Sequence, residues 1–164
     1  MATTPMTFAA ASLDATARIV TLLVWALSLG SIVGGAIALQ HGASPAGAIL
    51  IAVGGSLVAL HGYLRRIEPR AYVVEEGALR VDRRSGSRRF VGPFRNVRRG
   101  ALGWRVAGDG GGYGYLGRFR ADGRTVSAYV TDRGKVVLLE VGGSALALSP
   151  DDPDEFVELV GSGG

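Results

Sequence analysis

The chain has 164 residues, enough for one ordinary soluble domain or for a smaller domain joined to a membrane segment, and 48% of them are hydrophobic. Residues 1–64 carry one Arg and one Asp, residues 65–135 carry 17 basic and 7 acidic groups, and residues 136–164 carry 6 acidic groups and no basic ones. The chain has no cysteine, which excludes disulfides, thiolate metal sites and cysteine nucleophiles.

Two uncharged segments predict a transmembrane helical hairpin over residues 19–64. Residues 19–39 are 21 residues without a charge, which at ~1.5 Å per residue reach ~31 Å, about the hydrocarbon thickness of a bilayer. Residues 47–64 form a second uncharged run of 18 residues, which is short but within the usual range for a spanning helix. Residues 1–18, ahead of the hairpin, are expected to form an N-terminal tail.

The basic residues around the hairpin predict its orientation. The linker at residues 40–46 contains no Lys or Arg, whereas Arg65, Arg66 and Arg70 closely follow the second segment. The positive-inside rule therefore places the linker outside and both the tail and the C-terminal domain in the cytoplasm. We expect a multi-pass protein of the cell inner (plasma) membrane with cytoplasmic N- and C-termini.

Two other interpretations of the apolar segments stay open. In a cleaved signal peptide, Ala36-Ile37-Ala38 would supply the small-x-small site, but the apolar core exceeds the usual ~7–15 residues and a second apolar segment follows. In a wholly soluble protein, both helices would be buried without a polar face. The hairpin remains the favoured interpretation.

Small residues at a spacing of four predict close packing of the two helices. Gly30 and Gly34 form a GxxxG pattern, and Ser31 and Gly35 repeat the spacing. On the second helix, small residues form a stripe at Ala48, Ala52 and Ser56. Small side chains let helix backbones approach closely, either within the hairpin or between copies of the chain. We expect the contact within the hairpin and leave oligomerisation open.

His61 is an ionisable residue inside the second apolar segment, which makes it a functional candidate by default. The two segments contain no Asp, Glu, Lys or Arg that could complete a proton relay or a ligand set. We therefore expect His61 to lie at the membrane interface with its polar tip toward water.

After the membrane segment, apolar and polar residues alternate, which is typical of strands. Two strands at residues 70–74 and 78–82 flank a Glu76-Gly77 turn and predict a hairpin. Further short strands, separated by glycine-bearing turns, predict an antiparallel sandwich or barrel. These strands are expected at residues 88–91, 102–106, 116–120, 125–131, 136–141 and 145–149.

A single C-terminal helix is predicted over residues 153–160. Asp152 would be its N-cap, and Glu155 would complete a capping box. The same two residues, with Asp151 and Asp154, could in principle hold a hard cation. Their spacing fits a helix start better, so no metal site is expected.

Four motifs follow one another between residues 103 and 157. They are Gly103-Trp104-Arg105, the glycine run from Gly110 to Gly114 ahead of Gly117-Arg118-Phe119, Tyr129-Val130-Thr131-Asp132, and the segment from Ser149 to Val157. In this order, behind a pair of helices, they resemble a family of bacterial pleckstrin-homology-like (PH) domains.

The resemblance covers residues 67–160 and leaves residues 161–164 as a flexible tail. It implies that the transmembrane hairpin is followed by a mostly-β domain, a PH-like antiparallel barrel or sandwich of about seven strands capped by one C-terminal α-helix. It also implies a binding role rather than a reaction, although a fold alone does not decide function.

The glycine-rich stretch at residues 109–117, DGGGYGYLG, allows three interpretations. Its backbone amides could form a nest for an anion such as a lipid phosphate. It could be a flexible loop whose tyrosines contact a membrane surface or a partner. It could also be a long hairpin connection in which glycines supply positive φ and close backbone approach, which is the interpretation we favour.

The soluble part contains no HExxH, GxSxG or Walker-type motif, and no histidine follows His61. We therefore expect neither an enzyme nor a cofactor. The predicted function is a membrane-anchored binding or interaction module at the cytoplasmic face. It would contact an unknown membrane protein partner, a second copy or anionic lipid head groups, and no nucleic acid. An accessory subunit of a larger membrane complex and a sensor of a phosphorylated small ligand remain alternatives.

The basic strip beside the membrane segment could attract anionic head groups, each Lys or Arg near the surface contributing ~1 kcal/mol. It could equally be a solvated face that only fixes the topology. The candidate residues for ligand or partner binding are Arg88, Arg89, Arg98, Arg99, Arg105, Tyr113, Tyr115 and Arg118.

Overall fold

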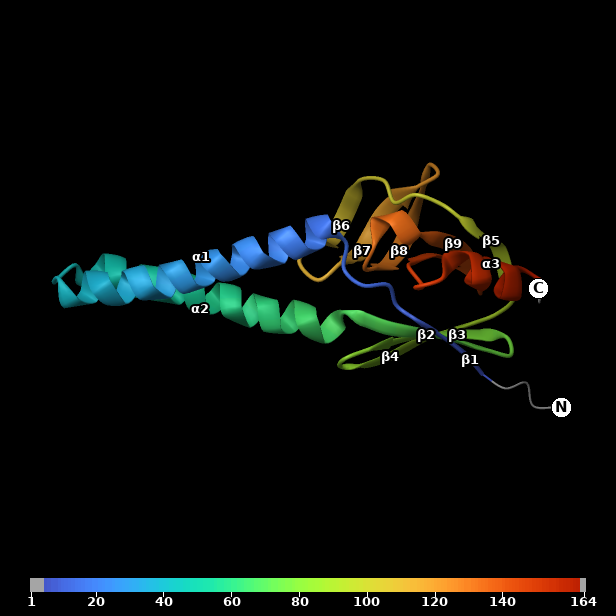
Figure 1. The fold of residues 1–164 in the computed structure, drawn as a ribbon, viewed down its shortest axis with the longest axis horizontal. Coiled ribbons are helices and arrows are strands. Elements are labelled where there is room, and N and C mark those ends of the chain that lie inside the picture. The colour runs from blue at the N-terminus through green and yellow to red at the C-terminus, as the bar shows by residue number, and fades with distance from the viewer. Residues whose placement is uncertain (1–4, 163–164) are drawn as a thin grey trace.

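The computed structural model describes residues 5–162 and consists of a helical hairpin that projects from a mostly-β domain (Figure 1). Helices α1 (Ala15–Gln40) and α2 (Ser44–Ile67) lie side by side, and their connection is at the end far from the domain. Both are long and apolar enough to cross a membrane, and their large apolar side chains mostly face outward. They are therefore not the buried core helices of a soluble protein.

The helices are longer than the uncharged segments that predicted them. Helix α1 begins at Ala15 because Asp14 is its N-cap, with Asp14 Oδ1 accepting a hydrogen bond of 2.8 Å from the Ala17 amide. Helix α2 continues through Arg65 and Arg66 to Ile67. The absence of charge marks the apolar part of a helix, whereas its ends are set by caps and by the domain that follows.

Close packing within the hairpin is confirmed through Gly35, one of the expected small residues, and through Gly54, but not through Gly30 and Gly34. A Cβ atom on Gly35 would lie 2.7 Å from the Gly47 carbonyl oxygen, and one on Gly54 would lie 2.7 Å from the Ser28 carbonyl oxygen. A Cβ atom on Gly30 or Gly34 would meet nothing within 4 Å, so the GxxxG pattern faces away from α2. The prediction from Gly30 and Gly34 was wrong because spacing alone does not say which face of a helix meets its partner.

The segment before α1 supplies a strand that the sequence did not predict. Strand β1 (Met6–Ala9) pairs antiparallel with β2 (Pro69–Glu75), and Phe8 lies opposite Tyr72. The chain then runs on past Ala11, whose amide donates to the Ser149 carbonyl oxygen at 2.8 Å. Residues 5–14, expected as part of a tail, thus belong to the β-domain; residues 1–4 and 163–164 lie outside the described part.

Within residues 5–162 the β-domain has ten strands in two sheets, rather than about seven. The first sheet has the order β1-β2-β3-β4 and the second the order β5-β9-β10-β8-β7-β6. Neighbouring strands are antiparallel, except that β8 and β10 run parallel. The remaining strands are β3 (Ala78–Arg83), β4 (Gly86–Val91), β5 (Phe94–Arg99), β6 (Arg105–Gly110), β7 (Tyr115–Ala121), β8 (Arg124–Val130), β9 (Val137–Val141) and β10 (Ser144–Leu148).

A C-terminal helix completes the core, as predicted. Helix α3 (Pro153–Gly161) is N-capped by Asp152, whose Oδ1 accepts from the Glu155 amide at 2.9 Å. The reciprocal bond from the Glu155 side chain is absent among residues 5–162, so the capping box is only half formed. Fully buried Phe156 meets the Phe8 ring edge-on at 4.8 Å, which joins α3 to the N-terminal strand. The mostly-β domain with one C-terminal helix is confirmed.

Candidate functional site

The glycine-rich loop between β6 and β7 lies against the domain-proximal ends of both helices. Thr21 Oγ1 of α1 donates a hydrogen bond of 3.1 Å to the Gly112 carbonyl oxygen. The Tyr113 ring lies 4.7 Å from the ring of His61 on α2, which in turn lies 4.7 Å from the Trp25 ring on α1. The loop therefore connects the hairpin to the β-domain.

His61 is buried by these contacts, with only 4% of its surface exposed. The rings on either side of it, Trp25 and Tyr113, come from α1 and from the loop. The expectation that its polar tip points to water was wrong, because an element distant in sequence covers it.

Asp109 gives the loop its shape. Its carboxylate accepts hydrogen bonds from the amides of Gly112, at 3.2 Å, and Tyr113, at 3.4 Å. Burial raises the pKa of the Asp109 carboxyl above its ordinary value, while bonds from the Gly112 and Gly110 amides and the charge of Arg105 oppose the rise. Because two loop amides already bind this carboxylate, the loop fits a structural connection better than an anion nest.

Glycine is required where β6 and β7 approach each other. Gly108 has φ of 109°, and a Cβ there would lie 2.2 Å from the Leu116 carbonyl oxygen. Gly117 has φ of 130°, and its Cβ would lie 2.3 Å from the Ala107 carbonyl oxygen. The glycine content of this region therefore has a backbone explanation.

Asp14 provides a second connection between the hairpin and the domain. Besides capping α1, its Oδ1 accepts from the Tyr115 hydroxyl at 3.3 Å and its Oδ2 accepts from the Arg133 amide at 3.2 Å. Burial, and then the charge of Asp14, raise the pKa of the Tyr115 hydroxyl. The start of α1 is thus held by β7 and by the 3₁₀ turn at Arg133–Lys135.

A groove of about 630 Å³ lies between the last two turns of α2 and the β-domain. This volume is within the range of ~300–1,000 Å³ typical of small-molecule sites. One wall is apolar and comes from α2, and the opposite wall carries cationic groups from the strands. The apolar wall consists of Leu60, Tyr63, Leu64 and Ile67, and the cationic wall includes Arg83, Arg88, Arg118 and Tyr129.

The three arginines of the groove have no carboxylate partner in the described part of the chain. Every salt bridge within residues 5–162 involves other basic residues. The Nε atom of Arg83 is buried and makes no hydrogen bond there, and Arg88 Nη1 donates to the Tyr129 hydroxyl at 2.8 Å. A cationic wall without acidic partners is suited to an anionic ligand.

Of the eight residues predicted as a binding site, the structure brings only Arg88 and Arg118 together in this groove. Three of the other arginines are paired on the surface: Arg89 with Glu75 at 3.4 Å, Arg98 with Asp122, and Arg99 with Asp154 at 3.0 Å. Arg105 Nη1 donates to the Gly108 carbonyl oxygen at 3.1 Å, and Tyr113 and Tyr115 are buried.

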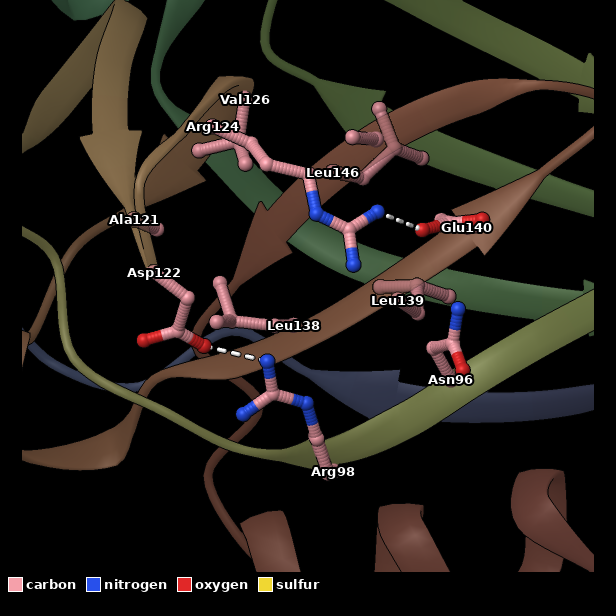
Figure 2. A pocket seen from close by; sticks show the side chains of 11 residues that line it. Asn96, Arg98, Ala121, Asp122, Arg124, Val126, Leu138, Leu139, Glu140 and Leu146 are labelled. Carbon is pink, nitrogen blue, oxygen red and sulfur yellow. Dashed lines mark hydrogen bonds and ion pairs between the residues drawn. The ribbon is translucent and has the colours of Figure 1, made fainter.

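Figure 2 shows the surroundings of Arg98, a small hollow of about 30 Å³. There Arg98 points to Asp122, and Arg124 points to Glu140, each as an ion pair. Side-chain hydrogen bonds from Asn96 and Arg124 hold the pKa of Glu140 below its ordinary value. With its charges paired and little room inside, this hollow is a poor ligand site.

Sequence reasoning missed Arg83, Tyr129 and the apolar wall of the groove. Arg83 stands in a run of arginines with no feature that distinguishes it from its neighbours. The spacing of Leu60, Leu64 and Ile67 along one helical face was a usable signal. These apolar residues were interpreted as part of the membrane segment and not as the wall of a site. Within the described residues, no group of three or more His, Asp or Glu side chains is placed to hold a metal ion.

The fold and the groove together define a PH-like β-domain carried on a two-helix hairpin. The family described as Bacterial PH domain matches residues 70–162, more than half of the chain. The protein belongs to this bacterial PH domain family, as the motifs in its sequence indicated. No curated protein and no solved structure matches the chain.

Proposed function

We propose that the protein is a membrane-anchored binding module that holds its PH-like domain at the cytoplasmic face and takes up an anionic ligand in the groove beside α2. The observation that carries this proposal is the set of three arginines without a carboxylate partner among residues 5–162, Arg83, Arg88 and Arg118, at the end of an apolar hairpin. PH-like domains are binding folds, and nothing in the groove suggests a reaction.

The orientation is supported by the charges around the hairpin. Arg65 and Arg66 lie in the last turn of α2, next to the domain, and Arg18 lies in the first turns of α1. The connection at residues 41–43 has no Lys or Arg. By the positive-inside rule, the domain lies in the cytoplasm and the connection outside.

The contacts between the hairpin and the domain support a role at the membrane surface. The loop at Tyr113 and the cap at Asp14 fix the domain to α2 and α1 respectively. These contacts place the groove beside the last turns of α2. A ligand in the inner leaflet would be presented to the site at high effective concentration.

The absence of cysteine makes the orientation easy to test, because a single introduced cysteine is the only thiol. His41→Cys in the connection and Ser162→Cys behind α3 should react differently with a membrane-impermeant maleimide in intact cells. We expect labelling of His41→Cys in intact cells and of Ser162→Cys only after permeabilisation. The reverse pattern would reject a cytoplasmic domain.

Anion binding by the groove is tested with the full chain in nanodiscs of zwitterionic phosphatidylcholine, titrated with phosphatidylglycerol or soluble glycerol phosphate. We expect at least one of the two probes to raise the melting temperature of the protein. No shift with either probe would reject the groove as an anion site.

A second candidate function, docking of another transmembrane helix, is favoured by the outer face of the hairpin. Gly30 and Gly34 on α1 face open space, as does Gly55 on α2. A GxxxG face of this kind lets a helix of a second copy or of a partner approach closely. Crosslinking through Gly34→Cys in membranes would capture such a neighbour, and its absence would count against this candidate.

A further inference from the structure

We infer that the groove holds one anionic phospholipid, with its phosphate on Arg83, Arg88 and Arg118 and an acyl chain along α2. This inference rests on the function proposed above and adds the chemical class of the ligand. It follows from the two walls of the groove: one is apolar and comes from α2, and the other is cationic and comes from the strands.

The apolar wall forms a continuous strip on α2. Leu60, Leu64 and Ile67 are spaced at i, i+4 and i+7, so they lie on one helical face, and Tyr63 extends the same wall. Leu60 is 50% exposed and Tyr63 is 60% exposed, although both border the β-domain. The strip extends for ~10 Å along the helix. An acyl chain would cover it.

The cationic wall is built from both sheets. Arg83 ends β3, Arg88 lies on β4 and Arg118 lies on β7, so three strands converge on one side of the groove. The buried Nε atom of Arg83 lacks an acceptor among the described residues. A phosphate oxygen is the acceptor to which a guanidinium group is best suited.

Asp109 is the acidic residue among those that line the groove, and its carboxylate is engaged elsewhere. Both of its oxygens accept hydrogen bonds from the Gly112 amide. Three arginines against one carboxylate leave an excess of positive charge. A lipid with a net negative head group is therefore favoured over a zwitterionic one.

The level of the groove relative to the bilayer favours a lipid over a free phosphate ester. Helix α2 has 24 residues and a length of ~36 Å, which exceeds the ~30 Å hydrocarbon core. With the apolar part of α2 centred in the bilayer, its last turns lie at the level of the head groups. There the arginines meet lipid phosphates, and the strip on α2 continues toward the acyl chains.

A lipid in this position would connect α2 to both sheets. It would touch the helix on one side and strands β3, β4 and β7 on the other, near the loop that carries Tyr113. Binding to the folded state alone stabilises that state in proportion to the logarithm of the ligand concentration. Occupancy of the groove should thus strengthen the attachment of the domain to the hairpin.

The experiment uses the full chain, purified in mild detergent and reconstituted in phosphatidylcholine nanodiscs that contain a minor fraction of phosphatidylglycerol. Native mass spectrometry counts the lipids retained by each protein, and thermal unfolding reports stability. The test variant is R83Q/R88Q/R118Q, and the matched control is R89Q/R98Q/R99Q. The control removes the same charge from arginines that are paired outside the groove.

We expect one retained phosphatidylglycerol per chain, a loss of about tenfold or more in its retention in the test variant, and little change in the control. L60A/L64A should also weaken retention, because it removes apolar contacts and leaves all the arginines. Equal losses in the test and control variants would overturn the inference and indicate non-specific attraction of charge.

Soluble glycerol phosphate separates this inference from the proposed function. If it raises the melting temperature as much as the lipid does, and L60A/L64A has no effect, the groove is an anion site but not a lipid site. The proposed function then stands and the inference falls. If neither probe acts on the wild-type protein, both fall. Thermal unfolding of each variant without added anion shows whether it is folded.

Discussion

The ring of Tyr113, in the loop between β6 and β7, lies 4.7 Å from the ring of His61 on α2. The two residues are 52 positions apart, and their contact fixes the PH-like domain against the hairpin. Tyr113 is buried, with 8% of its surface exposed. The loop thus acts as a structural connection at the base of the helices.

Replacement of Tyr113 by Ala should loosen this connection. Loss of a buried aromatic side chain typically costs ~3–5 kcal/mol, and the cost here should be at least about 2 kcal/mol because the site lies at the edge of the domain. Chemical unfolding of the full chain in detergent measures it. Tyr113→Phe keeps the ring and should stay within about 0.5 kcal/mol of wild type. Equal destabilisation by both variants would contradict a role of the ring contact.

Two adjacent glycines of α2 should respond oppositely to the same substitution. Gly54→Ala places a methyl group 2.7 Å from the Ser28 carbonyl oxygen and should destabilise the hairpin by ~1–3 kcal/mol. Gly55 faces open space, so Gly55→Ala should be neutral or stabilise the helix by up to ~1 kcal/mol. Titration with a denaturing detergent measures the free energy of unfolding of both variants. The packing described for α1 and α2 is incorrect if Gly55→Ala proves the more harmful change.

The N-terminal strand should contribute to the stability of the β-domain. Phe8→Ala removes a ring that packs on Phe156 at 4.8 Å and should cost ~3 kcal/mol. Met6→Ala, in the same strand but 36% exposed, is the matched control and should cost less than about 1 kcal/mol. Denaturant titrations monitored by circular dichroism measure the free energy of unfolding of the two variants. No loss in the Phe8 variant would mean that β1 is not docked in solution.

We predict that the folded protein loses stability at alkaline pH because buried Tyr72 ionises. Burial raises its pKa to about 12, while hydrogen bonds with Ser149 act in the opposite direction. Its hydroxyl donates to the Tyr129 carbonyl oxygen at 2.6 Å and accepts from the Ser149 amide at 3.2 Å. The unfolded Tyr72 side chain ionises near pH 10, so below pH 10 the folded state keeps all the stability that the neutral Tyr72 hydroxyl gives it. As the pH rises from 10 to 12, the free energy of unfolding falls by about 3 kcal/mol in total.

The measurement is the free energy of unfolding of wild type and Tyr72→Phe at several pH values between 9 and 12. The variant loses the two hydrogen bonds and should be less stable at pH 9. The gap between the two proteins should then narrow as the pH rises. A constant gap would show that Tyr72 does not titrate in this window.

The arrangement of charge and hydropathy along the chain was enough to predict the helical hairpin, most of the strands and α3. These features are local: an uncharged run of 21 residues, alternation with a period of two, and an Asp-Pro pair at a helix start are each visible within one segment. The same holds for the motifs that indicated the bacterial PH domain family.

Strands β1 and β5 were missed for physical reasons. Strand β1 has only four residues, too few for a period to show, and it is stabilised by pairing with β2 across the whole hairpin. Strand β5 has Arg at three of its six positions, and its register with β9 shifts between Arg95 and Arg98. Such edge strands form because a neighbour offers hydrogen bonds, which no local pattern records.

The candidate site depended on the tertiary structure to a greater extent. The sequence identified a surplus of arginines but not which of them find carboxylate partners, because each salt bridge joins residues that are brought together only by folding. Arg88 and Arg118 were predicted, whereas Arg83 and the strip at Leu60 came from the convergence of α2 with two sheets. Composition thus determined that this protein has an apolar helical hairpin and a basic domain. The placement of the domain against α2 decided which basic groups border the groove, and folding decided which of them lack a carboxylate partner within residues 5–162.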